Sequence, residues 1–343
     1  ARLDNGQHLL LGAYTELAAY LALVHEPGTV PLMRLPLEWR DPAGFRLCLP
    51  PWPAPWHVAW GLLRAQGWQW RDKWAALRLV TYLRRQRFMP PDEQSVAKLW
   101  RCTDQTTRTI TDLWHPLCLA ALNTPPHLAS SRVFAAVLRD SLLGARTASD
   151  AWLAQVDLGA LFPEPAARWL QERGGWVHCR QRVLRLLPQV HGGWQVETSQ
   201  KVWSAAVVVL AVAPQHVAAL LPSLPALSGW RECLERFCFE PIATVYFQCP
   251  ATVRLPHPFY ALSDGWGQWV FDRGHSLPHQ AGWLAVVISS SGGWQSLDKT
   301  SLCAAVWAQL RTHWDLPPYR FAQLIVEKRA TFAAYTNLIR PTV

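Results

Sequence analysis

The stretch Asp4-Asn5-Gly6-Gln7-His8-Leu9-Leu10-Leu11-Gly12-Ala13-Tyr14 decides how the rest of the chain is interpreted. A turn-forming Asp-Asn-Gly and a polar Gln-His pair precede a short apolar run, and a helix is expected directly afterwards, at residues 15–24. A junction from strand to helix exposes backbone N–H groups, and glycine lets a flat or anionic ligand approach the main chain. The residues alone leave two interpretations open, a ligand-facing segment and a plain loop.

Composition sets the class of protein. The chain has 343 residues, 50% of them hydrophobic and 17% charged, so it can bury a large core and is expected to form two domains. A net charge of +9 together with 21 tryptophans favours anionic lipid headgroups or an apolar ligand over nucleic acid. No two cysteines have Cys-x-x-Cys spacing, so no metal site is predicted. The longest apolar run, residues 205–213, is too short to cross a bilayer, which predicts peripheral membrane contact.

Helical periodicity dominates the first half of the chain. Helices are expected at residues 56–66, 70–87, 95–101, 106–121 and 130–143. In the helix at 70–87, the basic residues Arg71, Arg78 and Arg85 recur every seven positions. Trp70 and Trp74 fall on a neighbouring face of the same helix. This pattern fits a membrane-surface or partner-binding helix and also an ordinary surface helix, and both interpretations stay open.

Strand patterns dominate the second half. Strands are expected at residues 176–179, 183–187, 194–197, 207–211, 242–248, 267–272, 282–289 and 321–327, and helices at 163–173 and 301–314. The run at 207–211 is apolar on both faces, as a buried strand of a parallel sheet requires. The alternating strands after residue 240 predict a second sheet.

Residues 4–14 resemble the flavin-facing segment of the hydroxysqualene dehydroxylases, also called squalene-associated FAD-dependent desaturases, of the flavin amine oxidase and phytoene desaturase superfamily. Two further stretches are similar to that family, residues 112–126 with their Leu-Asn-Thr-Pro-Pro ending and residues 156–175. The family's usual Leu-Pro before Val156 is replaced here by Ala154 and Gln155. The resemblance implies an α/β fold, with an incomplete FAD-binding Rossmann-like domain of the amine oxidase type and a substrate domain of mixed sheet and helices.

The resemblance also implies how the chain divides. The FAD-binding domain would comprise residues 1–25, 150–225 and 328–343, and the substrate domain, facing the membrane, residues 26–149 and 226–327. The sequence contains neither the Gly-x-Gly-x-x-Gly turn nor the Gly-Asp-Trp segment that hold FAD in the family. The chain is therefore expected to be truncated at both ends.

Candidate site residues follow from the same resemblance. FAD is the implied cofactor, and the positions that match its contacts in the family are Arg2, Asn5, Gly6, Gln7, His8, Val183, Ala211 and Pro214. His8 and Asp4 are candidate catalytic acids, because a titratable group near the flavin could protonate a departing hydroxyl. A role for His8 in hydrogen bonding alone is the alternative. Asn123 and Thr124 are candidate substrate-binding residues, although capping a helix end explains them equally well.

The implied reaction is the reductive removal of the hydroxyl group of hydroxysqualene, giving squalene in hopanoid and isoprenoid biosynthesis. Such a substrate predicts a tunnel lined by Leu, Phe and Trp from the helices at 56–143 and the sheet after residue 240. The implied location is cytoplasmic, on the surface of the inner membrane. Two alternatives are a related flavin desaturase or oxidase of carotenoid precursors or amines, and a non-catalytic lipid- or membrane-binding protein.

Overall fold

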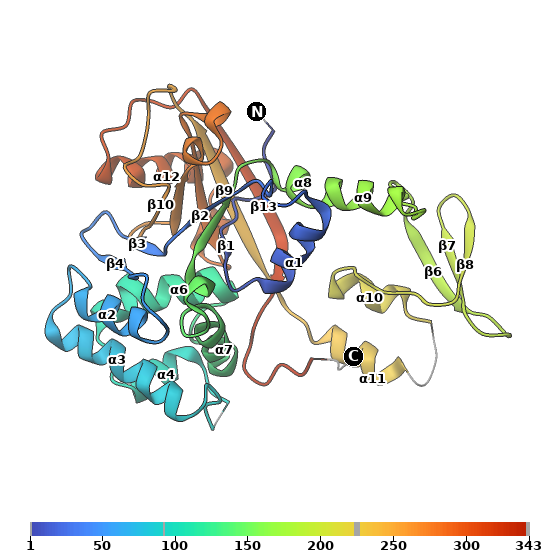
Figure 1. The fold of residues 1–343 in the computed structure, drawn as a ribbon, viewed down its shortest axis with the longest axis horizontal. Helices are drawn as coiled ribbons and strands as arrows, with labels where there is room; N and C mark the ends of the chain where they lie inside the picture. The colour runs from blue at the N-terminus through green and yellow to red at the C-terminus, as the bar shows by residue number, and fades with distance from the viewer. Residues whose placement is uncertain (1, 92, 223–226, 341–343) are drawn as a thin grey trace. The chain divides into compact units, whose positions relative to one another are not determined.

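The computed structural model describes residues 2–91, 93–222 and 227–340, which form two compact units (Figure 1). The first unit comprises residues 1–166 and 239–336, and the second comprises residues 167–238 and 337–343. These units are defined by contacts between residues. The predicted FAD-binding and substrate domains are defined by the ligands that they would bind, so that division stays a prediction.

The first unit contains most of the regular structure. Its elements up to the boundary are β1 (Leu10–Leu11), α1 (Thr15–Val24), β2 (Leu32–Leu35), β3 (Glu38–Arg40), β4 (Arg46–Cys48), α2 (Trp56–Arg64), α3 (Trp70–Arg85), α4 (Val96–Cys102), α5 (Thr107–Thr109), the π-helix η1 (Ile110–Trp114), α6 (His115–Leu122), α7 (Ser131–Ser141), η2 (Arg146–Ser149), β5 (Ala151–Ala154) and α8 (Leu158–Leu161). After residue 238 it continues with β9 (Phe239–Gln248), β10 (Phe259–Ala261), β11 (Trp269–Asp272), η4 (Arg273–His275), η5 (Pro278–Gln280), β12 (Trp283–Ser289), η6 (Gly293–Ser296), α12 (Lys299–His313) and β13 (Phe321–Phe332). Helix α9 (Pro163–Glu172) crosses the boundary between the units.

The predicted second sheet is confirmed as a five-stranded antiparallel sheet with the order β10-β11-β12-β9-β13. Strand β9 alternates between two cores, as the period of two along a strand requires. Val245 and Phe247 pack with α12 on one face, and Tyr246 packs with the helical layer on the other. The edge strand β10 was not predicted, because its three residues are too few to show a pattern.

The predicted helices between residues 56 and 143 are confirmed, with ends shifted by one or two residues. Their apolar faces meet in one core, in which Leu79, Leu83, Leu99 and Phe134 are fully buried. At the start of helix α3 the carboxylate of Asp72 accepts a hydrogen bond from the backbone N–H of Gln69 at 3.0 Å. Among the described residues, no helix is both long enough and apolar enough to span a membrane.

Gly12 fixes the position of the N-terminal segment. Strand β1 pairs with β5, which also pairs with β2, and the backbone N–H of Gly12 donates to the carbonyl of Asp150 at 2.9 Å. A Cβ atom at residue 12 would lie 1.8 Å from the carbonyl oxygen of Thr147. The glycine is therefore required by this close approach of two backbones.

The second unit contains an antiparallel meander of β6 (Val183–Pro188), β7 (Trp194–Thr198) and β8 (Val202–Ala205), followed by α10 (Pro214–Leu220) and α11 (Ser228–Glu235). The predicted strands at 183–187 and 194–197 are confirmed, whereas the one at 176–179 is wrong. The buried parallel strand predicted at 207–211 is also wrong, because Val207 is 77% exposed and Val209 is 84% exposed. An apolar run is buried only when neighbouring strands cover it, and no described strand pairs with this one.

Candidate functional site

The backbone of Asp4 is held by two elements that are distant in the sequence. The hydroxyl of Tyr246, on β9, donates to the carbonyl oxygen of Asp4 at 3.2 Å. The side chain of Asp4 accepts a hydrogen bond from the backbone N–H of Leu158, at the start of α8, at 3.1 Å. The start of the motif is thus pinned against the face of the five-stranded sheet.

Arg273 lies beneath the same segment and is only 3% exposed. Its Nε donates to Oε1 of Gln280 at 2.5 Å, and its Nη1 donates to Oε1 of Gln7. Nη2 lies 3.9 Å from the carboxylate of Asp4, and the guanidinium sits 5.4 Å from the ring centre of Tyr246. Burial lowers the pKa of Arg273, and the nearby Tyr246 and Asp4 oppose that shift. The buried guanidinium of Arg273 therefore lies close to both ends of the Asp-Asn-Gly-Gln turn, Asp4 and Gln7.

Two buried polar atoms beside this turn form no hydrogen bond within the described residues. They are Nη2 of Arg273 and Oγ1 of Thr244, whose side chain is 1% exposed. Thr244 lies next to Gly6, at 3.5 Å from the position that a Cβ atom of residue 6 would occupy. Because a buried donor without a partner is costly, both atoms fit a site that a polar ligand completes. The residues present thus fit the edge of a flat, hydrogen-bonding group.

His8 is exposed, and its Nδ1 lies 2.9 Å from the carbonyl oxygen of Gly6. A carbonyl can only accept, so Nδ1 carries the proton and Nε2 is left facing outward. Asn5 is also exposed, and Gln7 is half-buried. The structure therefore brings together Asn5, Gly6, Gln7 and His8, and their assignment to a cofactor stays a prediction.

The other predicted contacts lie in different surroundings. Arg2 is exposed and paired with Glu164 at 3.0 Å and with Asp157 at 3.5 Å, which raises its pKa. In the second unit, Val183 begins β6, Ala211 lies in an exposed irregular stretch and Pro214 begins α10. Their contact with a shared cofactor remains a prediction.

Asn123 and Thr124 are buried at the end of α6, where Asn123 adopts a left-handed conformation with φ 45°. The Asn123 amide donates to the carbonyl oxygens of Glu240 and Pro241, and its oxygen accepts from the N–H of Ser290 at 2.6 Å. The hydroxyl of Thr124 accepts from the N–H of residue 334 at 2.9 Å. These hydrogen bonds join the end of α6 to β9 and to the residues that follow β12 and β13, and the substrate-binding role of the pair remains a prediction.

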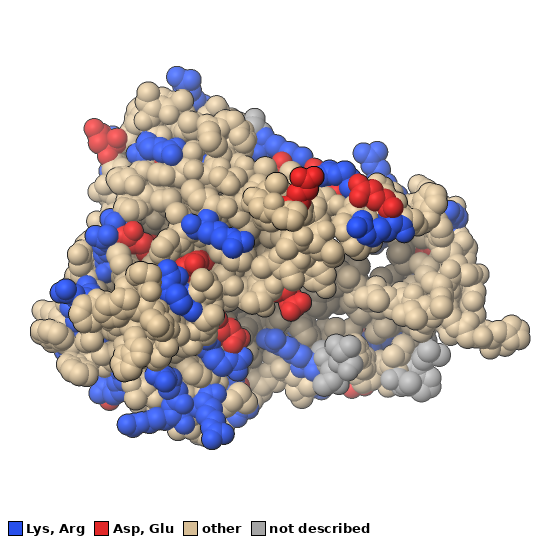
Figure 2. Space-filling view, viewed as in Figure 1, with Lys and Arg blue, Asp and Glu red and all other residues tan. Residues whose placement is uncertain are grey.

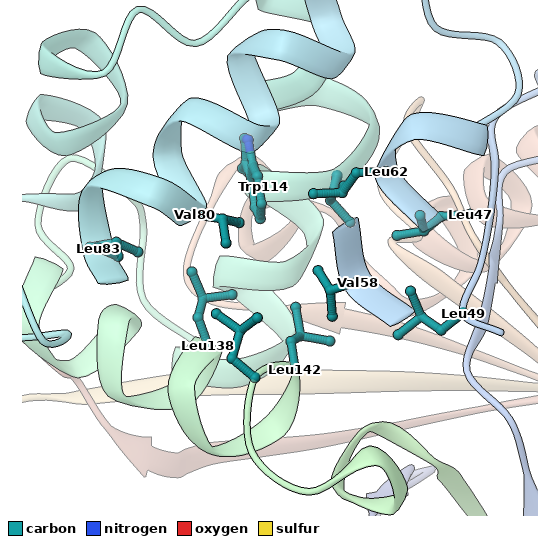
Figure 3. Close-up of a pocket in the computed structure, with 11 residues that line it drawn as sticks. Leu47, Leu49, Val58, Leu62, Val80, Leu83, Trp114, Leu138 and Leu142 are labelled. Atoms are coloured by element: carbon teal, nitrogen blue, oxygen red, sulfur yellow. The ribbon is translucent and has the colours of Figure 1, made fainter. Parts of the chain in front are cut away.

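An apolar cavity of about 20 Å³ lies within the helical layer. Figure 3 shows side chains from β4, α2, α3, η1 and α7 pointing into it. Its lining comprises Leu47, Leu49, Val58, Leu62, Val80, Leu83, Leu113, Trp114, Leu138, Leu142 and Leu143. Helices from the range 56–143 supply part of the lining and strands β9–β13 do not contribute to it, so the predicted tunnel stays a prediction.

Comparisons with known proteins agree with this arrangement. The chain is 25% identical to the hydroxysqualene dehydroxylase of Zymomonas mobilis, over 97% of this chain and 75% of that protein. It is 30% identical to the hydroxysqualene dehydroxylase of Rhodopseudomonas palustris, over 66% of this chain and 52% of that protein. The chain is a homologue of the hydroxysqualene dehydroxylases. No family model matches it.

Solved structures similar to this homologue of the hydroxysqualene dehydroxylases confirm the fold class. Cyclohexylamine oxidase from Brevibacterium oxydans aligns with a TM-score of 0.64 at 15% identity, covering 98% of this chain and 77% of that one. Putrescine oxidase aligns with a TM-score of 0.62 at 14% identity, covering 94% of this chain and 74% of that one. The predicted class, an oxidoreductase enzyme, is confirmed by the relatives named as dehydroxylases, and its flavin stays a prediction.

Several residues of the site were not predicted from the sequence. Tyr246 and Thr244 belong to a strand with an alternating apolar pattern, in which the sequence alone predicts only a core position for each of them. Arg273 and Gln280 lie in short 3-10 turns without a recognisable pattern. An arginine directly after the apolar strand Trp269–Asp272 was the one available signal, since buried arginines are rare without a partner.

Proposed function

We propose that the chain catalyses the FAD-dependent reductive dehydroxylation of hydroxysqualene to squalene, a step of hopanoid and isoprenoid biosynthesis. The observation that carries this proposal is the similarity to a hydroxysqualene dehydroxylase over 97% of the chain. The buried network beneath residues 2–8 supports it, because that network fixes the segment on which the resemblance was first based.

In the first unit, Gly6 offers the flavin edge a backbone without a side chain between the candidates Asn5 and Gln7, and Thr244 and Arg273 offer unpartnered donors. In the second unit, Val183, Ala211 and Pro214 are the candidate contacts. The chemistry that reduced FAD supplies when bound is the delivery of a hydride to carbon.

His8 is the candidate source of the proton. In its protonated form the outward Nε2 can give a proton to the substrate hydroxyl, so that the C–O bond breaks with water as the leaving group. A C–H bond then replaces the C–O bond, and the two electrons come from the reduced flavin. Asp4 is the second candidate, although its carboxylate is engaged by the N–H of Leu158 at 3.1 Å.

Product analysis tests the proposal. The natural enzyme with its flavin reduced should form squalene from hydroxysqualene, and the same enzyme with its flavin oxidised should form no desaturated product from phytoene. The opposite pattern would favour the desaturase alternative. We expect His8→Ala to lower dehydroxylation with FAD occupancy unchanged, and Asp4→Asn serves as the comparison. Unchanged turnover of His8→Ala at full occupancy would remove His8 from the mechanism.

A visible absorbance spectrum separates the enzyme from the non-catalytic lipid-binding alternative. Purified full-length protein should carry the absorbance bands of a bound flavin, released as FAD on denaturation. Protein that stays colourless after incubation with excess FAD, yet still binds lipid, would support the alternative.

We also propose peripheral attachment to the inner membrane through α3. Trp70 is 66% exposed and Trp74 is 63% exposed, and Figure 2 shows Lys and Arg side chains gathered where α3 and α4 lie in Figure 1. Arg78 is less suitable for binding lipid headgroups than its position in the sequence suggested, because its guanidinium already donates to the carbonyl oxygens of Thr103 and Asp104. Liposome flotation of Arg71→Glu with Arg85→Glu therefore tests the surface, and binding equal to that of the parent would refute it.

A further inference from the structure

Helix α2 departs from the usual pattern of a surface helix. Its inward face is ordinary, because Val58 and Leu62 are buried in the core of the helical layer. A surface helix normally turns polar and charged side chains outward. The outward face of α2 instead carries Trp56, Trp60 and Arg64, spaced four residues apart. Trp56 is 66% exposed and Trp60 is 39% exposed, so two indole rings face outward that the packing of the core does not require.

A third tryptophan extends this face. Trp52 is exposed in the loop before α2, and its ring centre lies 5.0 Å from that of Trp60. The guanidinium of Arg64 lies over the other exposed part of this group, 5.0 Å from the ring centre of Trp60. Prolines flank Trp52 on both sides and restrict its backbone. We call Trp52, Trp56, Trp60 and Arg64 the indole patch. Its rings are held by their neighbours, so little conformational entropy is lost when something binds to them.

The charge around the indole patch has one sign. Residues 42–71 contain no aspartate and no glutamate, and their charged side chains are Arg46, Arg64 and Arg71. The next carboxylate along the chain belongs to Asp72, whose side chain is buried. An anionic surface that approaches this stretch therefore meets positive charge and exposed indole rings but no carboxylate of residues 42–72.

Helix α3 (Trp70–Arg85) repeats the same combination of groups. Trp70 and Trp74 are exposed, and the amine of Lys73 lies 5.1 Å from the ring centre of Trp70. Helices α2 and α3 pack against each other and lie side by side in Figure 1. A folded protein partner presents different groups at different points, whereas a bilayer offers the same headgroup layer everywhere. That layer suits indole rings and long cationic side chains. An indole and a cation paired on both helices therefore favour a bilayer.

We propose that the indole patch inserts into the headgroup region of a phospholipid bilayer and anchors the chain by burying its tryptophan rings. This anchor is a second attachment, distinct from the one proposed for α3. The α3 attachment depends on the attraction of Arg71 and Arg85 for anionic headgroups, which salt screens. Burial of indole rings is an apolar effect, so it persists when charges are screened. The proposal does not depend on the cofactor or on the reaction, because it concerns only contact with lipid.

Flotation with vesicles tests the anchor. The purified full chain is mixed with vesicles of phosphatidylcholine alone, at roughly 0.1 M and roughly 1 M salt, where charges are screened within about 10 Å and about 3 Å. The wild-type chain should bind at both salt concentrations. Trp56→Ser combined with Trp60→Ser should weaken binding about tenfold or more at both, because two large rings no longer leave water.

A matched pair of tryptophans elsewhere in the chain provides the control. Trp176 and Trp266 are also exposed, and Trp176→Ser combined with Trp266→Ser should bind vesicles as the wild type does. Thermal unfolding verifies that both double variants are folded. Equal binding of the two double variants, or binding of the wild type that disappears at high salt, would overturn the anchor. A wild-type chain that binds neither phosphatidylcholine vesicles nor vesicles that also contain phosphatidylglycerol would overturn it in favour of a protein partner.

Two further measurements separate this anchor from the other proposals. Arg71→Glu combined with Arg85→Glu should lose the additional binding to vesicles that contain phosphatidylglycerol and keep the binding to phosphatidylcholine. Loss of both kinds of binding in that variant would assign the attachment to α3 and overturn the anchor. Dehydroxylation is assayed separately with substrate in detergent micelles. A chain that binds vesicles through the indole patch but forms no squalene would refute the proposed function alone.

Discussion

Nη1 of Arg273 donates a hydrogen bond to Oε1 of Gln7 across a sequence separation of 266 residues. This contact joins a turn of the second sheet to the segment that resembles a flavin-binding motif. Arg273 is also close to Asp4 and to the ring of Tyr246, so one side chain holds three parts of the site.

Replacing Arg273 by methionine should weaken both the fold and cofactor binding. The change leaves Gln7 and Gln280 without their buried donor, and we expect a loss of about 2–4 kcal/mol in the free energy of unfolding. Flavin affinity should fall as well, because residues 4–7 lose their support. Denaturant unfolding and flavin titration measure the two effects.

Arg254→Met is the matched control for that variant. Arg254 is half-exposed and lies 3.7 Å from Asp272, so its removal should cost less than about 1 kcal/mol and leave flavin affinity unchanged. Equal effects of the two substitutions would show that the buried network has no special importance.

The two glycines of the motif should respond differently to alanine. Gly12→Ala should destabilise the protein by about 3 kcal/mol or more, because its Cβ would lie 1.8 Å from the Thr147 carbonyl oxygen. Gly6→Ala meets its nearest atom at 3.5 Å, so stability should change by less than about 1 kcal/mol.

Flavin titration of the same two variants tests the role of Gly6. If the flavin approaches the backbone there, Gly6→Ala should weaken flavin binding about tenfold while the protein remains folded. Unaltered affinity of Gly6→Ala would contradict the assignment of this glycine to the cofactor.

His57 should make the protein sensitive to acid. It is fully buried, and neither ring nitrogen has a hydrogen-bond partner within the described chain. Burial, and then the charge of Arg146, lower the pKa of His57 below its usual 6.5. A lowered pKa means that the unfolded chain binds the proton first, so stability is present above pH 6.5 and falls as the pH drops below it. Unfolding measured from neutral to acidic pH should show a smaller decline in His57→Leu than in the wild type.

Tyr246 should produce the corresponding effect in alkali. Burial raises its pKa from 10.0 to about 12. The folded state therefore keeps the hydroxyl that donates to Asp4, and stability is constant below pH 10.0 and falls as the pH rises toward 12. The loss attributable to this group is about 2–3 kcal/mol. Tyr246→Phe should lack this part of the decline, and identical alkaline curves would rule the effect out.

The sequence predicted those parts of the fold whose patterns are local. The helices at 56–143 and the strands around Tyr246 repeat apolar residues at the correct period, and the structure confirms them. The run at 207–211 has an equally clear pattern but no described neighbour that covers it, so Val209 is exposed. The sequence pattern shows which side chains of a segment are apolar, but their burial depends on neighbouring elements that cover the segment.

The site was less accessible to prediction for a related reason. The resemblance located residues 4–8, but a motif does not reveal what lies beneath it. Arg273 and Thr244 belong to the site only because the fold brings them close to Gln7 and Gly6. Neither residue type stands out in its own stretch of sequence.

The Tyr246 hydroxyl and the Asp4 carbonyl are separated by 242 residues, which has a consequence for folding kinetics. Helices close their hydrogen bonds between near neighbours and form early, while contacts across such a span require most of the chain to be in place. In refolding experiments, helical circular dichroism should therefore recover well before ligand binding does. Newly made chains would pass through a stage that is already compact and helical but not yet able to bind a cofactor.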